Sequence, residues 1–279
     1  RFRDRDAVQP HGRKLVAADN GGQIYTSTDS GVTWTARETN RGWVSVASSA
    51  EGTKLVAADY SGAGFGGQIY TSTDSGVTWT TRGSNRNWHS VASSSDGMRL
   101  VAVVFGGQVY TSIDSGATWT ARETNRNWFS VASSADGTNL ATAVYGGQIY
   151  TSADFGVTWT ARESNQNWRS VASSADGTKL LAAVSGGRLY TSIDSGATWT
   201  ARETNRNWES VASSADGTKL VAAPSGQIHT SADSGVTWTA RATSRLWRSV
   251  ASSADGTKLV AAAYSGDQIY TSSGVGALV

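Results

Sequence analysis

The chain has 279 residues, enough for one large or two ordinary domains, and it contains 31 Gly, 12 Trp and 2 Pro. Its 24 Lys and Arg nearly balance its 22 Asp and Glu, so no strong field favours nucleic acid or an anionic membrane surface. It has no Cys, which excludes disulfides and thiolate chemistry, and no apolar run approaches the roughly 20 residues that span a bilayer.

After an irregular start over residues 1–12, the chain continues with four short segments rich in β-branched and aromatic residues. "KLVAA" begins at Lys14, "QIYTS" at Gln23, "TWT" at Thr33 and "WVSVASS" at Trp43. Gly, Ser, Asp and Asn separate the segments, and none shows helical periodicity for long. This pattern is typical of strands joined by tight turns.

The four segments return along the whole chain at intervals of about 40 residues. Copies of "KLVAA" begin at Lys14, Lys54, Arg99, Asn139, Lys179, Lys219 and Lys258. The second repeat is longer, because "SGAGFGG" follows Tyr60. Four antiparallel strands in such a repeat are the signature of a β-propeller blade. Closure into a ring protects the strand edges that an open sheet would expose.

The number of blades follows from the ends of the repeat. From Leu15 to Leu259 the "KLVAA" copies span six intervals, and the residues outside them together make nearly one more repeat. We therefore predict a single domain over residues 1–279, an all-β propeller of seven four-stranded blades closed by the N- and C-terminal segments. A six-bladed ring with a spare tail is the alternative, because neither terminus carries the full pattern.

The stretch "S-x-D-x-G-x-T-W" lies between the third and fourth strand of each repeat. Its Asp can accept backbone N–H bonds across a turn, its Gly supplies a positive φ, and its Trp can pack on the neighbouring sheet. The stretch resembles the Asp-box, or BNR, repeat of sialidases, sortilin-type receptors, some xyloglucanases and photosystem II assembly factors. The resemblance implies a structural turn away from any active site. It assigns that role to Asp29, Asp74, Asp114, Asp154, Asp194 and Asp233.

The stretch "TARETNRGW" and its copies join the fourth strand of one repeat to the first strand of the next, on the opposite face. Trp offers a flat apolar surface to a pyranose ring, and Arg, Asn and Glu offer directional bonds to hydroxyls. The predicted ligand-binding residues are Arg41, Trp43, Arg86, Trp88, Arg126, Trp128, Trp168, Arg206, Trp208, Arg245 and Trp247. The alternative is that these Trp pack between blades and the charged residues form a solvated ion-pair ring.

The copies differ at one position above all, the residue after the second Trp, which opens the innermost strand. It is Val44, His89, Phe129, Arg169, Glu209 and Arg248 in turn. The loop between the second and third strands also varies and lies on the same face, with Asp59 and Tyr60, Phe105, Tyr145, Ser185, Pro224 and Tyr264. These residues predict one asymmetric pocket near the central channel. Drift between duplicated copies is the alternative explanation.

We predict a non-enzymatic binding module, in the form of a multivalent, lectin-like propeller for carbohydrate or glycoconjugate. The alternatives are a protein-interaction scaffold, or a hydrolase of sialidase-like or, less plausibly, esterase type that uses His89, Glu209, Arg169 and Arg248. The likeness to sialidases covers the Asp-box alone, since residues 1–4 do not match "(F/Y)R(I/L)P", and no "GxSxG" elbow is present.

The remaining expectations concern partners. The three scattered His and the lack of Cys predict no metal site and no cofactor. We expect no nucleic-acid partner, no membrane insertion, a monomer, and an extracellular or periplasmic location. His229, which replaces the Tyr of "IYTS", is predicted to be a packed strand residue.

Overall fold

The computed structural model describes residues 7–8, 14–60, 66–264 and 269–273, and this part of the chain consists of strands and turns. The first nine strands are β1 (Ala7–Val8), β2 (Leu15–Ala18), β3 (Ile24–Ser27), β4 (Thr35–Arg37), β5 (Trp43–Ser48), β6 (Leu55–Asp59), β7 (Gly67–Ser72), β8 (Thr80–Arg86) and β9 (Trp88–Ser93). The longer strands follow: β10 (Leu100–Ser112), β11 (Thr120–Ser133), β12 (Leu140–Ser152), β13 (Thr160–Ser173), β14 (Leu180–Ser192), β15 (Thr200–Ser213), β16 (Leu220–Ser231), β17 (Thr239–Ser252), β18 (Lys258–Ala263) and β19 (Ile269–Ser273). The prediction of an all-β, antiparallel chain is confirmed.

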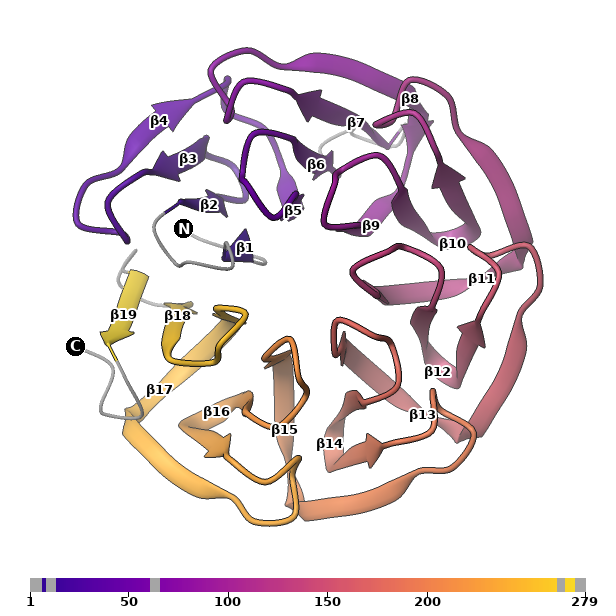
Figure 1. Ribbon diagram of the computed structural model, residues 1–279, viewed down its shortest axis with the longest axis vertical. Helices are drawn as coiled ribbons and strands as arrows, with labels where there is room; N and C mark the ends of the chain where they lie inside the picture. The colour runs from indigo at the N-terminus through magenta and orange to yellow at the C-terminus, as the bar shows by residue number, and fades with distance from the viewer. Residues whose placement is uncertain (1–6, 9–13, 61–65, 265–268, 274–279) are drawn as a thin grey trace.

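Strands that are neighbours in sequence pair with one another in successive antiparallel groups, and we call each such group, for example β1–β4, a ladder. β1–β4 form one sheet, β5–β8 a second, and β9–β19 a continuous third. The third is continuous because its long strands serve two ladders: β11 pairs with β10 over 120–127 and with β12 over 128–133. Figure 1 shows the ladders arranged in a ring around a central axis, with β18 and β19 beside β2 and β3.

The contact between the last ladder and the first repeats the contacts inside the ring. The Thr26 methyl packs against Gly76 of the next ladder, and the Thr111 methyl packs against Gly156 in the same way. The Thr271 methyl, near the end of the chain, packs against Gly31 of the first ladder. The two ends of the ring therefore meet through the same kind of contact that joins its other members.

The core lies between adjacent ladders rather than within any one of them. In the first of these interfaces, Val16 and Ile24 of one ladder pack with Trp43, Val46 and Tyr70 of the next. Equivalent clusters recur around the ring. Because each ladder is covered on both faces, its inner strands, such as Leu55–Ala58, are buried along their whole length.

Hydrogen bonds within the "S-x-D-x-G-x-T-W" stretch fold it into a turn. Ser27 Oγ donates to Asp29 Oδ1 at 2.7 Å, and the backbone N–H of Thr33 donates to the same oxygen at 2.9 Å. Gly31 N–H donates to Ser27 Oγ at 2.9 Å, and the Trp34 indole donates to the Gly31 carbonyl at 3.1 Å. Gly31 has a φ of 87°, in the left-handed region that glycine adopts without strain.

The same side-chain bonds recur at Asp74, Asp114, Asp154, Asp194 and Asp233. The hydroxyl of the following Thr and the backbone N–H lower the pKa of each of these carboxyls, and of Asp29, to about 2. Each carboxylate is thus ionised at neutral pH and occupied by bonds to its own turn.

The sequence analysis missed a second Asp turn, between the first and second strands. Ser134 Oγ donates to Asp136 Oδ1 at 2.5 Å, and Thr138 N–H donates to the same oxygen at 3.0 Å. Backbone bonds connect these turns around the axis, from Ala135 N–H to the Ala175 carbonyl and from Ala175 N–H to the Ala215 carbonyl, both at 2.7 Å. They form an inner rim that joins successive ladders.

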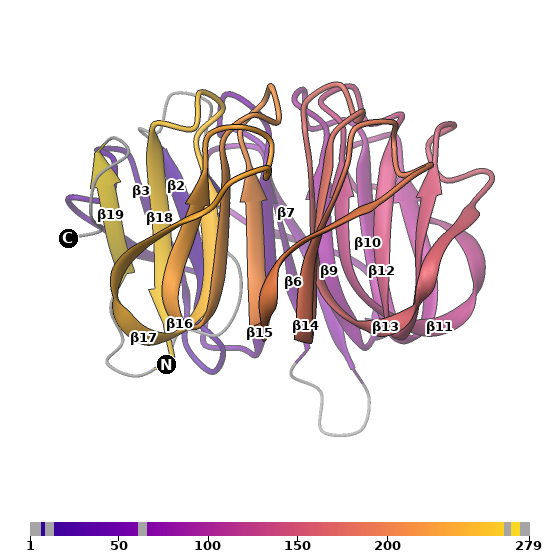
Figure 2. The same cartoon turned by 90° about the horizontal axis from the view of Figure 1, so that it is seen from below.

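The two kinds of Asp turn lie at the same end of the ring, because alternate turns of an antiparallel ladder share an end. A backbone bond of 3.0 Å from Ser115 to Met98 joins them within one ladder. We call this end the turn face. The opposite end, which we call the pocket face, carries the turns around residues 105–107 and 145–147 and the connections that lead into each buried Trp. Figure 2 shows the strands running between these two ends.

Candidate functional site: an asymmetric pocket on the ring axis

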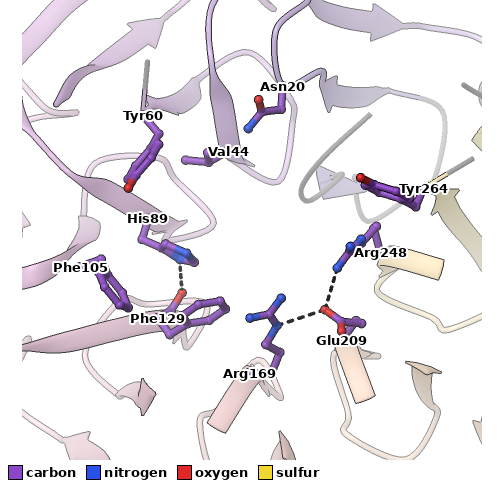
Figure 3. A pocket seen from close by; sticks show the side chains of 10 residues that line it. All are labelled: Asn20, Val44, Tyr60, His89, Phe105, Phe129, Arg169, Glu209, Arg248 and Tyr264. Carbon is purple, nitrogen blue, oxygen red and sulfur yellow. Dashed lines mark hydrogen bonds and ion pairs between the residues drawn. The ribbon is translucent and has the colours of Figure 1, made fainter. Parts of the chain in front are cut away.

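A cavity of about 440 Å³ opens on the ring axis at the pocket face. Its lining consists of Asn20, Val44, Tyr60, His89, Phe105, Phe129, Arg169, Glu209, Arg248 and Tyr264 (Figure 3). The six residues that follow the buried Trp are all among them. The structure thus brings the most variable position of the repeat into one place.

A β-bulge places each of these six side chains. Trp128 pairs with Val144 and Ser130 pairs with Ala143, so Phe129 is an extra residue on its strand. The same shift in register occurs at Val44, His89, Arg169, Glu209 and Arg248. A bulge locally bends the strand and redirects a side chain. Here the Trp points into the core between ladders while the next residue points to the axis.

One half of the pocket is aromatic. The His89 and Phe129 rings lie with their centroids 4.0 Å apart, and Phe105 lies 5.9 Å from His89. His89 Nδ1 lies 2.6 Å from the Phe129 carbonyl oxygen. A carbonyl can only accept a hydrogen bond, so the proton of a neutral His89 lies on Nδ1.

The other half is charged. Arg169 Nε donates to Glu209 Oε2 at 3.0 Å, and a terminal nitrogen of Arg248 donates to the same oxygen at 3.2 Å. The guanidinium of Arg169 lies 4.6 Å from the Phe129 ring, and that of Arg248 lies 4.6 Å from the Tyr264 ring. Aromatic stacking and a shared carboxylate therefore hold both guanidinium planes in place, and Arg169, Arg248 and Glu209 together carry one net positive charge.

The pocket contains the four residues named as catalytic candidates, His89, Glu209, Arg169 and Arg248. Tyr60, Phe105 and Tyr264 of the variable loops also line it. Tyr145 does not line the pocket itself, but its ring lies 5.7 Å from that of Phe129, which does. Ser185 and Pro224 are not among the lining residues either. Asn20 is a lining residue that the sequence analysis missed, although it stands before Gly-Gly in the first repeat as Phe105 and Tyr145 do in later ones.

The second Trp of each repeat is buried, whereas a Trp that stacks against a sugar ring must be exposed. Trp43, Trp88, Trp128, Trp168, Trp208 and Trp247 are 0–1% exposed. A pyranose needs an open indole face, and these rings are covered by the adjacent ladders. The alternative reading, packing between ladders, is the one that their burial fits. Equivalent Tyr rings complete the packing, as Tyr150 meets Trp128 edge to face at 5.1 Å.

The Arg residues of the same loops pack against these Tyr rings. Arg41, Arg86, Arg126 and Arg245 lie 4.6–4.8 Å from Tyr70, Tyr110, Tyr150 and Tyr270. Arg206 lies 6.0 Å from the Trp208 ring, much as Arg126 lies 5.9 Å from Trp128, and in its repeat His229 stands in place of the Tyr. Arg126 also forms an ion pair with Glu123 at 3.4 Å. The repeated Arg–Glu–Trp group is thus occupied largely by its own internal contacts.

His229 is 5% exposed and packs edge to face against Trp208 at 5.3 Å, so the prediction of a packed strand residue is confirmed. Among the described residues, no three His, Asp or Glu side chains are placed to hold a metal ion. The same part of the chain contains no helix that could cross a membrane.

No family model and no curated protein matches the chain. Several solved structures are similar to it in fold. The GH74 xyloglucanase from Xanthomonas campestris is 16% identical, with a TM-score of 0.77 over 98% of this chain and 52% of that one, so the chain spans about half of that enzyme. YCF48 bound to D1 peptide is 13% identical, with a TM-score of 0.72 over 98% and 93%. The β-propeller domain of Myceliophteria thermophila Cps50 (Swd1) is also 13% identical, with a TM-score of 0.74 over 98% and 96%.

Proposed function

We propose that this chain, a β-propeller by its likeness to solved structures, is a non-enzymatic binding module that takes one ligand per ring in the axial pocket. The observation that supports the proposal is the convergence of the variable bulge residues. A repeat that is otherwise nearly invariant differs at the positions that face this cavity. A well-formed pocket with a few convergent polar groups is the usual form of a ligand site.

We further propose that the ring has seven blades of the Asp-box type. The antiparallel ladders that begin at β1, β5 and β9, and then at each buried Trp from Trp128 to Trp247, would each be one blade. The contact of Thr271 with Gly31 supports closure of that ring. The hydrogen bonds of Asp29 and its counterparts support the Asp-box assignment and a structural role for these carboxylates.

Carbohydrate is the ligand class we propose for the pocket. Tyr60, 45% exposed at its rim, offers an open ring face of the kind that the buried Trp do not. Asn20, Glu209 and the two arginines provide directional donors and acceptors for hydroxyls. One pocket on the axis replaces the six equivalent loop sites expected from the repeat, so binding to a single ring would be monovalent.

A protein segment is the second candidate ligand. Val44, Phe105 and Phe129 form an apolar wall that suits an aliphatic or aromatic side chain. One of the similar propellers, YCF48, is bound to D1 peptide. A hydrolase is supported less well, because Glu209 is the only carboxylate among the ten residues that line the pocket, whereas most glycoside hydrolases use a pair.

A glycan array tests the proposal, with wild-type protein beside Phe129→Ala and a control, Asn165→Ala. Asn165 is exposed on β13 and is not among the residues that line the pocket, so its loss should leave binding unchanged. Phe129→Ala removes the ring that joins both halves of the pocket and should weaken binding at least about tenfold. A blank array, with binding of apolar peptides instead, would favour the second candidate. Equal binding by Phe129→Ala and wild type would refute the axial site.

A further inference from the structure

A second cavity, of about 170 Å³, lies on the outer part of the ring between β12, the start of β13 and two turns of the next ladder. Its polar lining includes Asn139, Thr151, Thr158, Thr160, Arg162 and Asp194. The equivalent space between the first and second ladders, beside Lys14, measures about 10 Å³. Two lining positions differ between these repeats: Asn139 stands in place of Lys14, and Ala153 in place of Thr28.

The first of these two positions begins the "KLVAA" segment. It is Lys or Arg in every copy except the fourth, where it is Asn139. In the other copies the long side chain lies along the next ladder. The Lys179 stem passes so close to Gly217 that a Cβ placed there would lie 2.7 Å from its Cδ, and Lys179 Nζ donates to the Asp216 carbonyl at 2.9 Å.

Asn139 makes the equivalent bond with a shorter side chain. Its Nδ2 donates to the Asp176 carbonyl at 3.0 Å, so the turn stays in place. Lys14 lines the small space, whereas the shorter Asn139 lines the large one. The large cavity thus coincides with shorter side chains at two positions of the repeat, Asn139 and Ala153.

The chemistry of the lining is that of a site for hydroxyl groups. Three Thr residues and the Asn139 amide provide donors and acceptors of no net charge. Arg162 and Asp194 bring opposite charges that balance. Arg162 Nε donates to Thr151 Oγ1 at 3.0 Å, which fixes the guanidinium and directs its fork. A guanidinium fork can donate to two hydroxyl oxygens at once. The Asp194 carboxylate already accepts bonds from Ser192 and Thr198 of its own turn, so its part in the lining is its negative charge.

We infer that this cavity is a second binding site, specific to the fourth repeat, for an uncharged polyol the size of a single pyranose unit. The balanced charge of the lining selects against ionic ligands, because an unpaired charge would lose its hydration without gaining a counter-charge. No aromatic ring is among the lining residues, so affinity is in the millimolar range. The inference rests on the outer cavity and does not depend on the axial pocket.

The repeat supplies its own reciprocal test. Asn139→Lys restores the residue present at Lys179 and should fill the cavity without harming the fold. Lys179→Asn should open an equivalent cavity one ladder further on, beside Thr191, Arg202 and Asp233. Each variant is titrated with a panel of methyl pyranosides, and binding is followed by amide chemical shifts in ¹H–¹⁵N spectra.

In the wild type, one or more pyranosides should shift the amides around Thr151 and Asp194 in a saturable way. Asn139→Lys should weaken this at least about tenfold, and Lys179→Asn should add a second set of shifts near Thr191. Unchanged shifts around Thr151 in Asn139→Lys, or no response there to any pyranoside in the wild type, would overturn the inference. Shifts confined to the axial pocket would overturn it too, while supporting the function proposed above.

Discussion

Replacing Trp128 by Ala should destabilise the protein rather than merely remove a ligand contact. The indole is 0% exposed, and it packs with Val103, Val131 and Leu140 across two ladders. Truncation of a buried Trp or Phe to Ala costs about 3–5 kcal/mol. Because the edge-to-face contact with Tyr150 is lost as well, we take the middle of that range, about 4 kcal/mol.

A loss of about 4 kcal/mol is a large fraction of the 5–15 kcal/mol by which domains are usually stable. For a domain of this size, each kcal/mol shifts Tm by about 2–4 °C, so Tm should fall by about 8–16 °C. Urea unfolding followed by circular dichroism measures the free energy, and Asn127→Ala, at an exposed neighbour, should change it by less than about 0.5 kcal/mol. A loss below about 1 kcal/mol for Trp128→Ala, together with loss of glycan binding, would refute the packing role.

Two further predictions concern titrating groups. In the Asp turns the folded-state pKa is lowered, so their stabilisation is present above about pH 4 and is lost as the pH falls towards 2. Asp114→Asn should therefore lower Tm at pH 7 and approach wild type near pH 2, and an equal deficit at both pH values would contradict this. Burial lowers the pKa of His229, so the wild type should lose stability below about pH 6.5. His229→Tyr should remove that loss and add about 0.5–1 kcal/mol through Arg206, which thermal melts at pH 5 and pH 7 would reveal as a larger gain at pH 5.

The sequence predicted the strands, their antiparallel order and the turns, because the signals involved are local. Ser27, Asp29, Gly31 and Thr33 bond among themselves within seven residues, and the residue types alone indicate those bonds. The repeat then multiplies each local signal along the chain, so that an ambiguous segment in one copy is clarified by the others.

The predicted ligand-binding role of the Trp residues is an example of what a local sequence pattern cannot decide. Trp and its neighbouring Arg, Asn and Glu suit either a sugar site or a packed interface, and their spacing is the same in both. The choice depends on whether another ladder covers the indole. For Trp128 the covering residues include Val103 and Val109, which belong to the preceding ladder.

The axial pocket was predictable in outline, since Phe129 and its counterparts stood out as the variable position of the innermost strand. The bulge that turns them toward the axis was not, because it depends on how Trp128 and Ser130 pair with the next strand. The pairing of Arg169 and Arg248 with one oxygen of Glu209 likewise joins residues about 40 positions apart.

The sequence by itself determined the repeat, its strands and its self-contained Asp turns, since each depends on residues within a few positions of one another. The tertiary structure alone decided what closure of the ring brings together. It buried the six indoles between ladders, turned the bulge residues into one asymmetric pocket, and left a second cavity beside Asn139. These features depend on contacts between ladders, and no single repeat contains both sides of such a contact.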